Sequence, residues 1–255
     1  MAAPSTSGLR SPAMVGVSTL LGLLAAVEAL IRAGVINRHV VPLPSQVVAA
    51  LPRIIAEEDI LGRFLMTAGE AAAAGLLLVA VAIPTGVLLH RARLLCEAVE
   101  GWIGAMAAAP LVLIYPLFLV IFGRSAWTII MIAFVAALPP VILKTLEGLS
   151  GTRAVLINVG RSFNLTPSQL YWKILFPSAL PTIFVGVRLG MIFALINIVG
   201  VEFLINFGGL GQLVNELSER YDLPGTYAAI CFVILVSVLF FIGTERIERW
   251  LRPGT

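Results

Sequence analysis

The chain has 255 residues, of which 59% are hydrophobic and 12% are charged, and its mean hydropathy is +1.01. A soluble domain is about 45–50% apolar and about 25% charged, so this chain has too few charges to cover its apolar surface in water. The net charge of +3 is small and scattered, which argues against a nucleic-acid partner. The apolar residues form runs long enough to cross a bilayer, which takes about 20 residues per helix. The composition therefore predicts an all-α, polytopic membrane protein.

Six apolar runs are expected to cross the lipid bilayer. In chain order they are 13–31, 71–89, 101–122, 125–143, 183–207 and 226–244. The segment 32–63 is polar and rich in proline, so we expect it outside the hydrocarbon with one short helix. Pro139 and Pro140 are expected to kink or end the fourth span, because proline removes an intrahelical hydrogen bond. The Gly-rich stretch 208–211 is expected to open a polar loop that lasts until Gly225.

The basic residues predict the orientation, because cytoplasmic loops carry an excess of Lys and Arg. With the N-terminus inside, ten basic residues fall in inner segments and six in outer segments. The inner ones are Arg10, Arg91, Arg93, Lys144, Arg153, Arg161, Lys173, Arg246, Arg249 and Arg252. The outer ones are Arg32, Arg38, Arg53, Arg63, Arg124 and Arg220. This bias predicts that both termini are cytoplasmic.

The sequence lacks the groups that catalysis inside a membrane requires. The two histidines, His39 and His90, lie in different loops, so the HExxH metal motif is absent. The two aspartates, Asp59 and Asp222, form no aspartyl-protease pair. No GxxxxGK[ST] motif occurs, so this chain does not bind ATP in the P-loop manner by itself. We expect a protein that is not an enzyme and has no metal or cofactor of its own.

The polar stretch from Ser150 to Pro181 predicts two short helices joined by a tight turn. The first helix covers Arg153–Phe163, and Asn164 follows it where a left-handed cap residue is needed. The second helix opens with the capping-box pattern of Thr166–Gln169, which has proline at the first helical position.

The second helix places Leu170, Ile174 and Leu175 on one face and is expected to stop at Pro177. Three basic residues, Arg153, Arg161 and Lys173, accompany the apolar face. Local physics leaves two interpretations open with equal weight. The pair either docks into a groove on a soluble partner or lies against lipid headgroups.

The spacing in this stretch resembles the cytoplasmic loop of bacterial ABC-importer permeases. The family pattern is E-A-A, a Gly six residues after the Glu, and then I-x-L-P. Asn158-Val159-Gly160 stands at the E-A-A position, Asn164 at the Gly position, and Ile174-Leu-Phe176-Pro177 at the I-x-L-P position. Asn therefore occupies both the Glu and the Gly position of the pattern.

The rest of the chain is similar to the branch of this family that moves sulfonates, taurine, nitrate, bicarbonate and thiamine-precursor pyrimidines. The matching segments occur in the family's order and extend over most of the chain. They are Leu43-Pro44-Ser45-x-x-Val48, Pro110, Tyr115-Pro116-Leu117, Phe122-Gly123, Ser178-Ala179-Leu180-Pro181, Gly186-Val-Arg188, and Glu202 seven residues before Gly209-Leu210-Gly211.

The resemblance implies a single transmembrane permease domain, 1–255, with a cytoplasmic coupling loop at about 146–181. Two copies would form a pathway in the bacterial inner membrane for a small anionic or heteroaromatic solute. An ATPase subunit, which holds ATP and Mg, would dock under each copy, and a periplasmic or lipid-anchored binding protein would deliver the solute. The residues expected to contact the ATPase are Arg153, Asn158, Gly160, Arg161, Phe163, Asn164, Leu170, Lys173, Ile174 and Pro177. Since Asn158 carries no charge, docking would depend on the basic residues and on apolar contact.

Four residues are candidates for the pathway or its gate, namely Glu202, Asn206, Arg188 and Pro116. A charge inside a span costs about 2.5–3.5 kcal/mol, so Glu202 either tunes an outer gate or dimer seam or is satisfied by local partners. With Asn206 it would form a polar face near the outer end of its helix. Arg188 either snorkels to the interface or attracts an anion on the inside. An autonomous secondary transporter or channel is the alternative function, although the sequence shows no convincing internal repeat.

Overall fold

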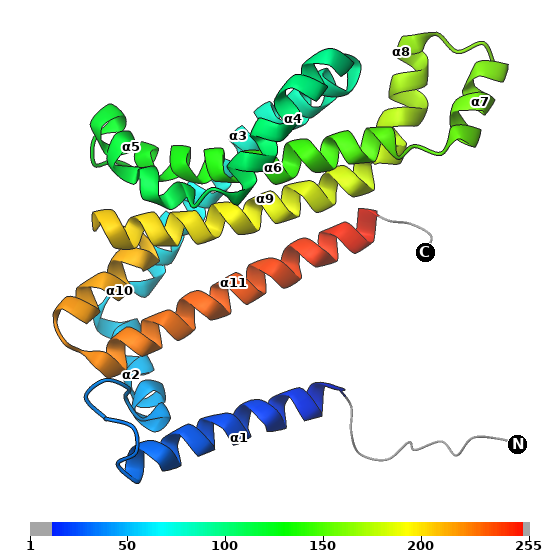
Figure 1. Cartoon of the computed structure of the whole chain (residues 1–255). Coiled ribbons are helices and arrows are strands. Elements are labelled where there is room, and N and C mark those ends of the chain that lie inside the picture. The colour runs from blue at the N-terminus through cyan, green and yellow to red at the C-terminus, as the bar shows by residue number, and fades with distance from the viewer. Residues whose placement is uncertain (1–11, 252–255) are drawn as a thin grey trace, which may run out of the picture.

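The computed structural model describes residues 12–251, and in that range it is helical without strands. Figure 1 shows the elements in chain order. They are α1 (Pro12–Arg32), α2 (Pro44–Glu57), α3 (Ile60–Arg91), α4 (Arg93–Ala108), the 3-10 turn η1 (Leu111–Ile114), α5 (Tyr115–Phe122), α6 (Ala126–Ser150), α7 (Ala154–Ser162), α8 (Pro167–Leu170), the π turn η2 (Tyr171–Leu175), α9 (Phe176–Ile205), α10 (Gly209–Glu219) and α11 (Leu223–Leu251).

The centre of the fold is the pair α6 and α9, which lie side by side, with α3 packed against both (Figure 1). Three glycines permit this close approach. A Cβ on Gly190 would lie 2.6 Å from a methyl of Val141, and one on Gly148 would lie 3.1 Å from the Ala179 carbonyl oxygen. A Cβ on Gly186 would lie 2.6 Å from the Cβ of Lys144. Small residues at helix contacts are typical of membrane bundles, where packing holds the helices together.

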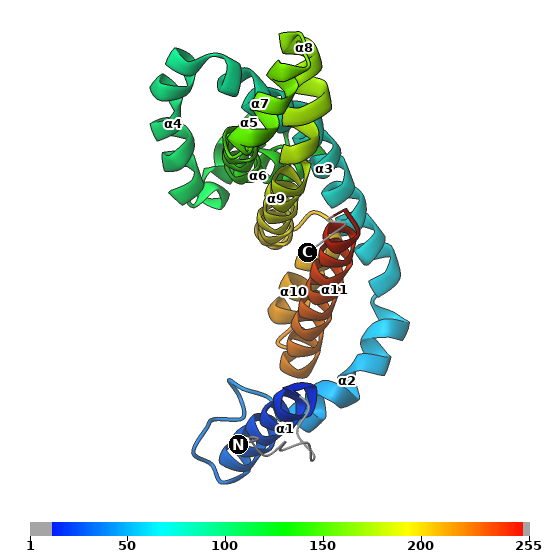
Figure 2. The ribbon, with the colours of Figure 1, turned by 90° about the vertical axis from the view of Figure 1, so that its right-hand side faces the viewer.

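The two ends of the bundle carry different elements. In Figure 1, α7 and α8 project at one end of α6 and α9, whereas α2, α5 and α10 lie at the opposite end. The start of α1 and the end of α11 point toward the α7–α8 end. Helix α1 contacts α2 and stands apart from the bundle, as the view in Figure 2 also shows.

Five of the expected apolar spans are present as continuous helices within the described residues, and a sixth is present if a bent helix pair is counted as one span. Five helical segments are long and apolar enough to span a membrane, and they are Met14–Arg32, Ile60–Arg91, Ala126–Ser150, Pro167–Ile205 and Leu223–Arg246. The sixth crossing, expected as the continuous run 101–122, is broken. Its two parts, Arg93–Ala108 and Leu111–Phe122, meet at an angle of 89°. Pro110 lies at the break and has no N–H group with which to continue the first helix.

Several other features differ from the sequence-based prediction. Helix α3 begins at Ile60, eleven residues before the expected span, and so takes Glu70 into the bundle. Helix α6 runs through Pro139 and Pro140 without ending. Pro177 does not stop the second loop helix, because it occupies the first turn of α9 and the helical path continues. The expected polar loop after Gly208 is helix α10, which buries Leu210, Leu213 and Leu217.

Of the residues used for the orientation, Arg10 and Arg252 lie outside the described residues. The side chain of Arg249 is also outside the description.

Candidate functional site

The turn between α7 and α8 has the conformation that its residues predict. Asn164 has φ 53°, in the left-handed region that Asn tolerates better than most residues. The Asn164 N–H donates to the Arg161 carbonyl over 2.9 Å, and the Leu165 N–H donates to the Gly160 carbonyl over 3.1 Å. This pair of bonds is a Schellman motif with Asn in place of Gly.

The second helix of the loop starts with the expected capping box. The Gln169 N–H donates to the Thr166 hydroxyl over 3.3 Å, and the Thr166 N–H donates to the Gln169 side-chain oxygen over 3.0 Å. Pro167 occupies the first helical position. The two reciprocal bonds satisfy N–H groups that would otherwise lack partners at a helix start.

Gly160 is the point at which α7 contacts the second helix. A Cβ there would lie 2.6 Å from the terminal methyls of both Leu170 and Ile174. Behind this contact the buried ring of Tyr171 anchors the loop to the bundle, since the Arg91 guanidinium lies 4.6 Å from its centroid. The loop is therefore held by its own caps and by a small apolar core.

The outer side of the loop, by contrast, is apolar and uncovered. Helix α7 and its C-cap residue expose Val155 (66%), Leu156 (41%), Val159 (46%) and Phe163 (77%). These residues recur at helical spacing on one side of α7, and we call them the α7 apolar face. The predicted contact residues Arg153, Asn158, Arg161, Asn164, Lys173 and Pro177 are also exposed, while Gly160 is buried and Leu170 and Ile174 are partly buried.

At the opposite end, Glu202 is fully buried, and each of its carboxylate oxygens accepts a hydrogen bond within the chain. One carboxylate oxygen accepts from the Thr67 hydroxyl over 2.7 Å, and the other accepts from the Gly211 N–H over 2.8 Å. The Leu210 N–H in turn donates to the Thr67 oxygen over 2.9 Å. Glu202 thus joins α9 to the N-terminus of α10, where the helix dipole favours a negative charge.

The Gly-Leu-Gly sequence is explained by the carboxylate of Glu202. Gly209 has φ 73°, and a Cβ there would overlap that carboxylate. A Cβ on Gly211 would overlap the Val199 carbonyl oxygen and lie 2.7 Å from the Cβ of Glu202. These positions need glycine because the first turn of α10 rests directly on α9.

Glu70 on α3 was missed by sequence reasoning because it lay just outside the expected span. Its side chain is buried, and neither of its oxygens has a hydrogen-bond partner among the described residues. The nearby carboxyl group of Glu202 interacts with Glu70 electrostatically. The spacing of Thr67 and Glu70, three residues apart on one helix face, is the signal that was available. We call Thr67, Glu70, Glu202, Gly209 and Gly211 the α10 corner.

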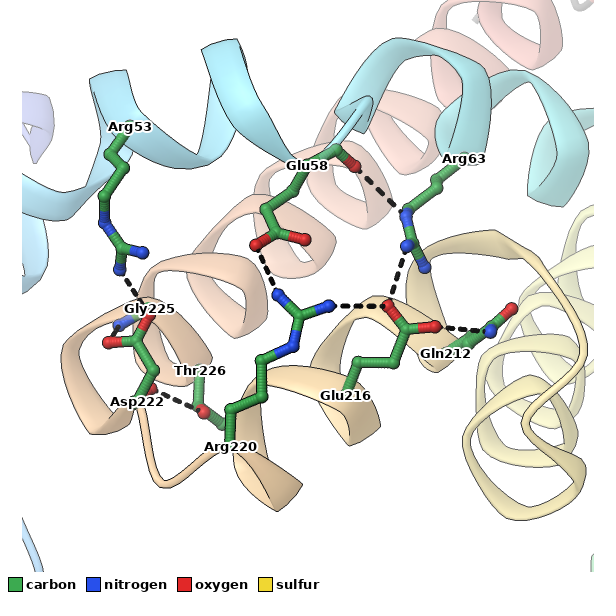
Figure 3. Close-up of polar contacts among 9 residues, drawn as sticks. All are labelled: Arg53, Glu58, Arg63, Gln212, Glu216, Arg220, Asp222, Gly225 and Thr226. Atoms are coloured by element: carbon green, nitrogen blue, oxygen red, sulfur yellow. Dashed lines mark hydrogen bonds and ion pairs between the residues drawn. The ribbon is translucent and has the colours of Figure 1, made fainter.

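Beside the α10 corner, an ion-pair network ties α2 and the start of α3 to α10 and the start of α11 (Figure 3). Arg63 contacts Glu216 at 2.7 Å and also donates to the Glu58 carbonyl over 3.1 Å. Arg220 contacts the Glu58 carboxylate at 2.7 Å and Glu216 at 3.7 Å. Gln212 donates to Glu216 over 2.5 Å.

A further ion pair of the network joins Arg53 on α2 to Asp222. The hydrogen bond and the charge of Asp222 raise the pKa of the Arg53 guanidinium above its usual range. Asp222 also accepts from the Gly225 N–H over 3.1 Å, which orders the start of α11.

The remaining pathway candidates do not gather around Glu202. Asn206 caps α9 with φ 50°, and its backbone carbonyl accepts a hydrogen bond from Arg124. The Arg188 guanidinium lies 5.4 Å from the Phe241 ring on α11. Pro116 is exposed in the first turn of α5.

A cavity of about 350 Å³ lies where the broken crossing meets α6 and α9. Pro110 and Met106 contribute from the break, and Phe193 and Asn197 contribute from α9. No charged residue lines it, and Asn197 is its only side-chain amide. The volume lies in the range of small-molecule sites. Sequence reasoning missed Asn197 because its surroundings depend on a helix break about 85 residues away.

Comparison with known proteins agrees with this architecture. Over 178 residues the chain is 27% identical to the formylaminopyrimidine transport permease protein ThiX of Halalkalibacterium halodurans, covering 68% of this chain and 71% of the relative. Over 171 residues it is 25% identical to the taurine transport system permease protein TauC of Escherichia coli, covering 67% of this chain and 62% of the relative.

Among solved structures, an inward-facing conformation of the MetNI methionine ABC transporter shares the fold. Its TM-score is 0.66 at 20% identity, over 76% of this chain and 96% of the other. The family described as binding-protein-dependent transport system inner membrane component matches residues 78–253. The chain belongs to this family and is a membrane permease component of the ABC-importer type.

Proposed function

We propose that two copies of this chain form the membrane pathway of an ATP-driven importer, and that the α7–α8 loop receives a cytoplasmic ATPase subunit. The observation that carries the proposal is the α7 apolar face. The loop is internally capped and anchored, yet Phe163 and Val155 are 77% and 66% exposed. A rigid element that leaves apolar side chains in water is typical of a surface that a partner covers.

The charges around this face indicate how the partner is held. Arg153, Arg161 and Lys173 are exposed on the same loop, and Asn158 supplies no carboxylate. An ATPase groove with acidic residues at its rim would complement this surface. ATP and Mg would be bound by that subunit. The same end holds the start of α1 and the end of α11, so both termini would be cytoplasmic.

The opposite end, with α2, α10 and the ion-pair network, would then face the periplasm of the bacterial cell. A binding protein would deliver the solute there.

The cavity at the helix break is a candidate for the solute's contact within the membrane. Its wall offers the Phe193 ring and the Asn197 amide but no cation, which favours an uncharged heteroaromatic solute over a sulfonate.

Co-purification and uptake with the matching ATPase and binding protein test the proposal. Phe163→Ala is expected to reduce retained ATPase about tenfold and to abolish uptake, because it removes the largest exposed side chain of the face. Asn197→Leu is expected to lower uptake while ATPase retention stays unchanged. Leu76→Ala is the matched control, since Leu76 is 74% exposed on α3 outside the loop.

Two results would overturn the proposal. One is full ATPase retention and full uptake by Phe163→Ala. The other is uptake driven by an ion gradient without nucleotide, which would favour an autonomous secondary transporter.

A further inference from the structure

Glu70 and Glu202 form a buried carboxyl pair inside the membrane bundle. Glu70 is 4% exposed and Glu202 is 0% exposed, and they come from α3 and α9 respectively. The two carboxyl groups lie close enough for the charge of Glu202 to act on Glu70. Two ionised carboxylates in such a place would repel each other strongly, because little water is present to screen them.

No cationic side chain is available to compensate the pair among its described contacts. The groups that act on Glu202 are the Thr67 hydroxyl, the Leu210 and Gly211 N–H groups and Glu70. Arg63, one turn before Thr67 on α3, is committed to Glu216 and to the Glu58 carbonyl. The compensation must therefore come from something other than an ion pair.

The surroundings favour a negative charge on Glu202. Both of its oxygens already accept hydrogen bonds, from Thr67 over 2.7 Å and from Gly211 over 2.8 Å. The N-terminus of α10 also points at this carboxylate. A proton on Glu202 would therefore compete with donors that are already in place.

Glu70 has the opposite surroundings. Both oxygens are buried, and neither has a donor among the described residues. An ionised carboxylate can only accept hydrogen bonds, whereas the protonated form has one O–H to donate. A proton on Glu70 would make this unpartnered carboxyl a hydrogen-bond donor, and the Glu202 carboxylate could accept that bond.

We propose that the α10 corner is a proton-binding site, in which Glu70 is a neutral carboxylic acid at neutral pH that donates its hydrogen bond to the Glu202 carboxylate. The proton holds α3 against α9 and α10. The site is independent of the transport function proposed above, because it is complete within one chain.

Infrared spectroscopy of the full chain in nanodiscs at neutral pH tests this site. The wild-type protein should show the carbonyl band of a protonated carboxylic acid, and Glu70→Gln should lose that band. Glu97→Gln is the matched control, because the Glu97 side chain is 58% exposed and pairs with Arg93. It should leave the band unchanged.

Thermal unfolding supplies a second readout that does not depend on the spectrum. Glu70→Gln should keep the wild-type midpoint, because the amide N–H₂ can donate to the same Glu202 oxygen. Glu70→Leu should lower the midpoint, because a leucine side chain cannot donate a hydrogen bond to the Glu202 carboxylate.

Three results would overturn the proposal. The first is the absence of the band in the wild type or its persistence in Glu70→Gln. The second is a midpoint for Glu70→Gln as low as that for Glu70→Leu. The third is a midpoint that rises with Na⁺ or Ca²⁺ at constant ionic strength in the wild type but not in Glu70→Gln, which would assign the site to a metal cation. None of these measurements involves the ATPase, so their failure leaves the proposed function untouched.

Discussion

The α10 corner buries polar groups, whereas the α7–α8 loop exposes apolar groups. At the corner, Glu202 is fully buried, and its partners come from α3 and α10. In the loop, the caps at Asn164 and Thr166 are made by residues a few positions away, and the α7 apolar face stays uncovered. The α10 corner forms its contacts within a single chain, whereas the α7 apolar face leaves apolar side chains for a partner to cover. The contrast indicates that substitutions in the corner should affect folding, whereas those on the loop surface should affect assembly.

The largest expected effect is that of Gly211→Ala in the corner. The new Cβ would overlap the Val199 carbonyl oxygen, and backbone has little freedom to move, so we expect a loss of about 3 kcal/mol in the free energy of unfolding. Denaturant unfolding in detergent measures this loss. Gly69→Ala on α3 is the control, because nothing lies within 4 Å of a Cβ there. Similar stability of the two variants would mean that the corner is not tightly packed.

A smaller effect is expected from the ion-pair network beside the corner. The side chains of Arg63 and Glu216 are 21% and 20% exposed, so a double-mutant cycle with Arg63→Gln and Glu216→Gln should give a coupling energy of about 1 kcal/mol. The same cycle on Arg93 and Glu97, with 91% and 58% exposure, should give about 0.3 kcal/mol. Equal coupling in both pairs would contradict a structural role for the network.

The smallest effect on global stability is expected at the loop turn. Asn164→Ala should cost about 1 kcal/mol locally, because Ala is strained at φ 53°, whereas Asn164→Gly should cost nothing. The Leu165 amide, which donates to Gly160, should exchange its hydrogen faster in the Ala variant alone. Global unfolding should not change, since the loop projects beyond the bundle. A global loss in either variant would show that the loop and the bundle unfold as one unit.

Features that depend on neighbours in the chain were predictable. The left-handed Asn164 and the capping box from Thr166 to Gln169 involve contacts of three to five residues, so their patterns can be recognised directly. The apolar runs likewise predicted the crossings, although not their ends.

Features that depend on distant partners were not predictable in the same way. Two prolines suggested an end to α6, yet the helix continues there while α9 packs against it, with Gly186 beside the Pro140 carbonyl oxygen. The sequence predicted a loop in place of helix α10, because glycines and polar residues lie between the buried Leu210, Leu213 and Leu217. A proline inside a membrane helix is tolerated where neighbouring groups supply hydrogen-bond partners for the backbone groups that it leaves free.

The sequence by itself determined the class of this protein, because its apolar runs and scarce charges leave few structures other than a helical membrane bundle. It also determined the local caps and carried the family resemblance. Only the tertiary structure decided that Glu202 meets Thr67 across 135 residues and that Glu70 lies beside them. The reason is physical: a buried carboxyl is stable only with partners close in space, and their distance along the chain leaves no periodic signal in the sequence.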